Sequence, residues 1–91
     1  MSDEEYEKAI DQLLERAIEQ FRAARGNPAE LAAAIERYLV EGDALEMSPY
    51  ELHDYFHISS PGLLEKAGYP ESEVEDGSEL FNKVSTARYD T

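Results

Sequence analysis

Helix-start signals divide this 91-residue chain into short segments. Three of its four prolines directly follow a residue type that caps helices well, at Asn27-Pro28, Ser48-Pro49 and Ser60-Pro61. A capping side chain followed by proline at the first helical position is typical of a helix N-terminus. We therefore expect short helices that begin at these three points, and one more that precedes them.

The N-terminal segment has the clearest helical periodicity. Ser2 and Glu5 match a capping box, and Gly26 predicts the C-terminal end of the helix. Leu14 and Ile18 are expected at the centre of the apolar stripe. The stripe recurs at the i, i+3, i+4, i+7 spacing of an amphipathic helix and consists of Tyr6, Ile10, Leu13, Leu14, Ala17, Ile18 and Phe21.

A second helix is predicted from Pro28 to Gly42. Its centre, Ile35 and Leu39, should meet Leu14 and Ile18, because the short Gly26-Asn27 connection favours an antiparallel helical hairpin over residues 3–41. The apolar stripe of this second helix comprises Leu31, Ala34, Ile35, Tyr38 and Leu39.

The second half of the chain is harder to assign. A helix from Ser48 would turn Leu52, Tyr55 and Phe56 towards the core, and a short helix from Ser60 to Gly68 would bury Leu63, Leu64 and Ala67. Residues 70–78 are predicted to be an acidic loop, since 71–79 holds five acids and a single apolar side chain. Ser78 would then cap a last helix with Leu80, Phe81 and Val84, and residues 88–91 would be a tail.

These patterns predict an all-α fold, with four to five short helices around one small core in a single domain, 1–91. The absence of Cys excludes disulfides, thiolate zinc sites and cysteine nucleophiles, and it fits a reducing compartment. No apolar run approaches the roughly 20 residues of a membrane span. We therefore expect a cytoplasmic protein.

The charge of the chain is its strongest functional signal. With 21 acidic and 8 basic residues, the net charge is -13. Nucleic acid and anionic membranes repel such a chain, and basic protein surfaces attract it. The acidity either serves solubility or marks a protein-binding surface. In size, acidity and lack of catalytic residues the chain resembles phage anti-CRISPR proteins, other DNA mimics and small immunity proteins.

The first functional hypothesis is therefore an inhibitor that covers a basic, nucleic-acid-binding protein surface by electrostatic mimicry. A tyrosine beside carboxylates is common at protein-binding surfaces, so we include Tyr69 in the predicted surface together with acids from residues 3–15 and 71–76. The predicted partner-binding residues are Asp3, Glu4, Glu7, Asp11, Glu15, Tyr69, Glu71, Glu73, Glu75 and Asp76.

A second hypothesis is a small transcription regulator. Residues 48–68 resemble a helix-turn-helix of the excisionase or MerR type, which would make residues 60–68 a DNA-reading helix. Only Lys66 could serve there as a basic contact, and His57 occupies the position of the turn glycine. This hypothesis therefore has the regulator bind another transcription protein in place of DNA. The resemblance rests on Glu51, Leu52, His53, Tyr55, Phe56, His57, Ile58, Ser59 and Leu63.

A third hypothesis is metal binding by His53 and His57, which are spaced i, i+4 on one helix. No third ligand is identifiable, so a structural role for both is favoured and no metal or cofactor is predicted. The chain also lacks a phosphate-cradling glycine loop and an identifiable Ser–His–Asp arrangement. We therefore expect that it is not an enzyme.

Overall fold

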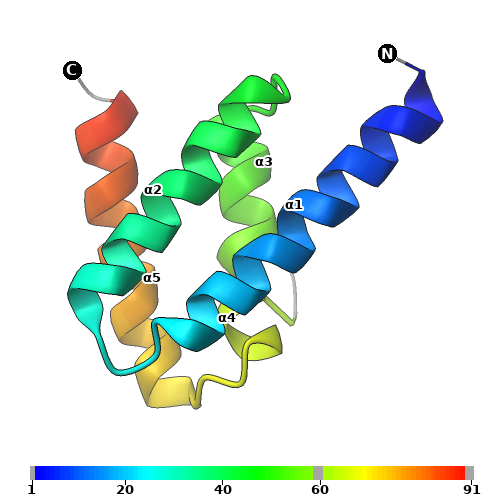
Figure 1. Ribbon diagram of the computed structural model, residues 1–91. Coiled ribbons are helices and arrows are strands. Elements are labelled where there is room, and N and C mark those ends of the chain that lie inside the picture. The colour runs from blue at the N-terminus through cyan, green and yellow to red at the C-terminus, as the bar shows by residue number, and fades with distance from the viewer. Residues whose placement is uncertain (1, 59–60, 90–91) are drawn as a thin grey trace.

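The computed structural model describes residues 2–58 and 61–89, and these are helical throughout apart from short turns (Figure 1). No strand occurs in this part of the chain, so the predicted all-α fold with four to five helices is confirmed. The elements are α1 (Asp3–Ala23), α2 (Pro28–Ala44), α3 (Pro49–His53), a π-helical turn η1 (Asp54–Ile58), α4 (Leu63–Lys66) and α5 (Glu71–Tyr89).

The helices α1 and α2 form the expected antiparallel hairpin (Figure 1). The predicted caps are present: Ser2 Oγ accepts a hydrogen bond from the Glu5 amide at 3.3 Å, and Asn27 Oδ1 accepts one from the Glu30 amide at 3.2 Å. Each cap satisfies a backbone N–H that has no partner within its helix. The local sequence thus sets both helix starts.

The rest of the chain covers this hairpin. The helix α5 packs along α2, while α4 packs against α1 and α3 contacts α2. Four aromatic rings meet where these elements converge: Phe56 stacks on Phe81 at 4.2 Å between ring centroids and meets Phe21 edge-on at 5.6 Å. The fourth ring, Tyr38, donates its buried O–H to the Leu52 carbonyl at 2.7 Å, so the core holds a polar atom without leaving it unsatisfied.

The buried face of α1 differs from the predicted one by about one residue. Its centre consists of Leu13, Ala17 and Phe21, whereas Leu14 and Ile18 are only half-buried. The predicted centre was therefore wrong. Because α1 is packed by both α2 and α4, the middle of its buried face is set by two neighbours. In the second helix Ile35 and Leu39 are fully buried, as expected.

The predicted acidic loop at 70–78 is also wrong, because the single helix α5 begins at Glu71 and continues to Tyr89. Ser78 lies inside this helix instead of capping it. The predicted tail is helical at Arg88 and Tyr89, and its last two residues lie outside the described part. Acids in a first turn are stabilised by the helix dipole, and Val74, Gly77 and Phe81 supply a buried face at helical spacing.

Two glycines lie inside helices because neighbouring elements approach them closely. The helix α2 continues through Gly42, its predicted end, to Ala44; a Cβ at Gly42 would lie 2.4 Å from Leu52 Cδ2. A Cβ at Gly77 would lie 2.3 Å from Leu64 Cδ1. These glycines provide space for α3 and α4 and do not interrupt the helices.

Two further predictions for the second half need correction. The helix α4 begins after Gly62, two residues later than expected, and the predicted cap Ser60 lies outside the described residues. Leu63, Leu64 and Ala67 are buried as predicted. Tyr55 was expected in the core but is exposed, because the wider π-helical turn brings Phe56 rather than Tyr55 inward.

Candidate functional site

A row of exposed carboxylates runs along α1. They recur every four residues, which is a rise of about 6 Å and a rotation of about 40° per carboxylate, so the row winds by about 160° around the helix from its first member to its last. We call this row the α1 ridge; it consists of Asp3, Glu7, Asp11, Glu15 and Glu19, all exposed. Glu4 is exposed beside it. Glu19 was missing from the predicted surface, although its spacing continues the series.

None of the ridge carboxylates forms an ion pair with another residue that the structure describes. Within the described ranges, the ion pairs join Arg16 to Glu41 at 3.4 Å, Arg25 to Glu73 at 3.0 Å and Arg88 to Asp43 at 2.7 Å. Arg16 is the arginine nearest to the ridge in the sequence, and it reaches across to α2. The charge of the ridge is therefore left to solvent and to any partner.

The two acidic sets that the sequence suggested as one surface lie apart. Glu73 is bound to Arg25, so the first turns of α5 lie beside the C-terminal end of α1. Asp3 and Glu7 lie at the other end of this 21-residue helix, about 30 Å away. In Figure 1 the N-terminus and the start of α5 lie at opposite ends of the molecule. Glu71, Glu73, Glu75 and Asp76 thus form a second acidic region of their own.

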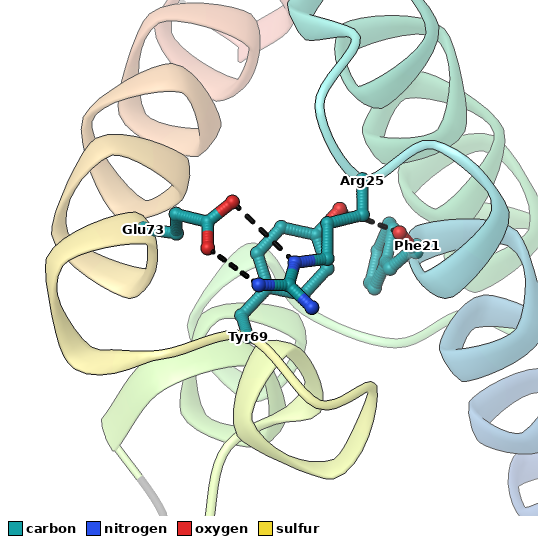
Figure 2. A network of polar contacts seen from close by, with 4 residues as sticks. All are labelled: Phe21, Arg25, Tyr69 and Glu73. Atoms are coloured by element: carbon teal, nitrogen blue, oxygen red, sulfur yellow. Dashed lines mark hydrogen bonds and ion pairs between the residues drawn. The ribbon is translucent and has the colours of Figure 1, made fainter.

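The sequence suggested that Tyr69 lies on an exposed partner-binding surface. In the structure Tyr69 is buried, so it is not part of such a surface. Its hydroxyl donates a hydrogen bond to the Phe21 carbonyl at 2.5 Å, beside the Arg25–Glu73 ion pair (Figure 2). Burial raises the pKa of Tyr69, Glu73 raises it further and Arg25 lowers it. The Phe21 carbonyl belongs to the last turn of α1, where carbonyls lack helical partners, so Tyr69 acts as a C-terminal cap from a distant segment.

Next to this network is a groove of about 290 Å³ between the α1–α2 turn and α5, which we call the turn groove. Its apolar lining includes Ala24, Leu31 and Leu80, and its carboxylates include Asp76 and Glu79. Tyr69, Glu73 and Lys83 also line it. The sequence could not indicate this groove, because one of its walls was assigned to a loop.

The histidines pack as structural residues. His53 stacks on Phe81 with ring centroids 5.3 Å apart, and its ring lies 6.2 Å from that of His57. His57 Nδ1 and Ser78 Oγ share a hydrogen bond at 3.0 Å, which ties η1 to α5. Among residues 2–58 and 61–89, no three His, Asp or Glu side chains are grouped so that they could hold a metal ion.

The helix-turn-helix resemblance does not extend to the shape of its second helix. The helix α4 has a single turn of four residues, and Leu63 and Leu64 are buried. The carbonyl of Lys66 accepts a hydrogen bond from Arg22 at 3.4 Å, which holds α4 against α1. A recognition helix must present several side chains to a groove of DNA, and α4 does not.

No protein family, curated protein or solved structure matches this chain. Among the described helices, none is both long and apolar enough to cross a membrane.

Proposed function

We propose that this protein is a binding module for a basic protein surface. In its sharpest form it is an inhibitor that covers a nucleic-acid-binding surface by presenting carboxylates where phosphates would lie. The observation that carries the proposal is the α1 ridge, whose carboxylates are exposed, regularly spaced and free of ion pairs to the described part of the chain. The net charge of -13 supports this function, because it attracts a basic partner.

The ridge suits such a role because a helix holds its charges in a fixed row. From Asp3 to Glu19 the row is about 24 Å long, with one charge per about 6 Å. The phosphate backbone of a nucleic-acid strand is likewise a regular row of negative charges. Lysine or arginine side chains that bind such a backbone could therefore bind the α1 ridge. In Figure 1 the N-terminal half of α1 forms an edge of the molecule, where a partner could reach it.

The proposal predicts how the partner binds. We expect the immobilised protein to capture a basic nucleic-acid-binding protein from an extract of its native host at low salt. Binding of the purified partner should weaken steeply towards about 0.5 M NaCl, because electrostatic attraction between exposed charges is screened. Excess nucleic acid should displace the partner. A partner that stays bound in excess nucleic acid, or at high salt, would contradict mimicry.

A variant in which two of the ridge carboxylates are neutralised tests whether the ridge is the binding site. Glu7→Gln combined with Asp11→Asn should slow association about fivefold to tenfold at low salt, because both residues contribute to steering. The matched control is Glu36→Gln combined with Glu65→Gln, which removes the same charge from exposed positions on α2 and α4. If ridge and control variants bind alike, overall charge and not the ridge determines binding.

A further inference from the structure

The turn groove has the size and lining of a site for one long side chain. Its volume of about 290 Å³ lies at the bottom of the range for small-molecule sites. Leu31 and Pro28 enter from α2 and Leu80 from α5, while Ala24 comes from the turn that follows α1. These apolar groups would contact a hydrocarbon stem.

The charged groups of the groove indicate what such a stem should end in. Asp76 and Glu79 are exposed, and neither forms an ion pair within residues 2–58 and 61–89. They are three residues apart on α5, so they project to neighbouring positions on the helix surface. Glu73 is already bound by Arg25, and Lys83 is the single cation of the lining. The two free carboxylates therefore favour a positively charged head group.

The chain itself provides an example of this recognition. Arg25 donates from Nε to Glu73 Oε1 at 3.5 Å and from Nη2 to Glu73 Oε2 at 3.0 Å, at the edge of the same groove (Figure 2). Two parallel N–H···O contacts are the geometry in which a guanidinium binds a carboxylate. A second guanidinium could donate N–H groups to the carboxylates of Asp76 and Glu79.

We propose that the turn groove receives one arginine side chain of the basic partner. The aliphatic stem packs on Leu31 and Leu80, and the guanidinium lies between Asp76 and Glu79. This inference rests on the proposed function and gives the partner a second contact, about 30 Å from the far end of the α1 ridge. It also assigns a role to Asp76, one of the acids of α5 that lie away from the far end of the ridge.

The probe is a blocked peptide with one arginine between two leucines, titrated into the isotope-labelled protein. We expect the largest amide shifts at Leu31, Gly77 and Leu80, with weak affinity because a short peptide loses much freedom on binding. A peptide with citrulline in place of arginine keeps the shape but lacks the charge. It should bind about threefold to tenfold more weakly.

Variants of the rim test the same contact from the other side. Asp76→Asn with Glu79→Gln should weaken the arginine peptide about threefold to tenfold, and Lys83→Gln should strengthen it, because it removes the competing cation. Glu36→Gln with Glu65→Gln is the control of equal charge. No binding, shifts centred elsewhere, or equal binding of the citrulline peptide would overturn the proposal. So would dilution-dependent shifts in the groove without peptide, which would make a second copy of the chain the occupant.

The two proposals fail separately. If the rim variant binds the native partner normally while the ridge variant does not, the groove assignment is wrong and the proposed function stands. If the ridge variant binds the partner normally, the proposed function is wrong even where the arginine peptide occupies the groove.

Discussion

At the scale of single residues, Tyr38 couples the fold to pH. Its hydroxyl is buried and donates to the Leu52 carbonyl. Burial raises its pKa far above the ordinary value of about 10, and the neighbouring Tyr55, Asp54 and Tyr89 raise it further. The folded protein therefore keeps the proton on Tyr38 at a pH where the unfolded chain loses it.

The expected outcome is alkaline destabilisation. Below pH 10 the Tyr38 contribution is constant, since both states are protonated. Above about pH 10 only the unfolded state releases the proton, so the free energy of unfolding falls by about 1.4 kcal/mol per pH unit from this residue. Urea denaturation between about pH 9 and pH 11 measures the slope. Tyr38→Phe, though less stable at all pH values, should show a shallower decline; equal slopes would contradict the assignment.

At the scale of helices, the orientation of α1 can be tested by neighbouring substitutions. Leu13 is fully buried, so Leu13→Ala should cost about 2–5 kcal/mol through lost transfer energy and a cavity. Leu14 is half-buried, and its truncation should cost less. Glu15→Ala, on the exposed ridge, should be neutral or slightly stabilising because it removes a repelling charge.

Thermal melts of the three variants in one buffer would rank them. A domain of this size holds about 5–10 kcal/mol of stability, so Leu13→Ala alone should lower the melting temperature markedly. If Leu14→Ala were the more damaging of the two leucine variants, the buried face of α1 would be turned by about one residue. If Glu15→Ala were as damaging as either, the ridge would not be exposed.

At the scale of the whole molecule, the unpaired acids should make stability depend on salt. The net charge is -13, and the three ion pairs among the described residues are partly exposed, so they offset little of the repulsion. Salt screens exposed charges over about 8–10 Å at physiological strength. The melting temperature should therefore rise from low salt to about 0.5 M NaCl. A flat or falling curve would show that internal partners already neutralise the acids.

Local signals in the sequence accounted for the helical hairpin and for the exposed acids. Capping residues and apolar periodicity act within one helix, and so Ser2, Asn27 and the stripe of α2 could be assigned without a structure. The α1 ridge follows from the same periodicity, because carboxylates four residues apart share a side of any helix. The partner that the ridge would bind is not encoded in this pattern.

What the sequence could not reveal depends on contacts between distant segments. Residues 71–79 carry few apolar side chains, and they become helical because Val74, Gly77 and Phe81 find a surface on α2 and α4. In the sequence Gly77 suggests a break in the helix. In the structure it lies within α5, where Leu64 packs so closely that a larger side chain would not fit. Tyr69 is buried where its hydroxyl donates to the Phe21 carbonyl, 48 residues away in sequence. Capping residues and apolar periodicity are local properties of the chain, whereas the helix over 71–79, the burial of side chains, the phase of a helix and the turn groove arise only when helices pack together.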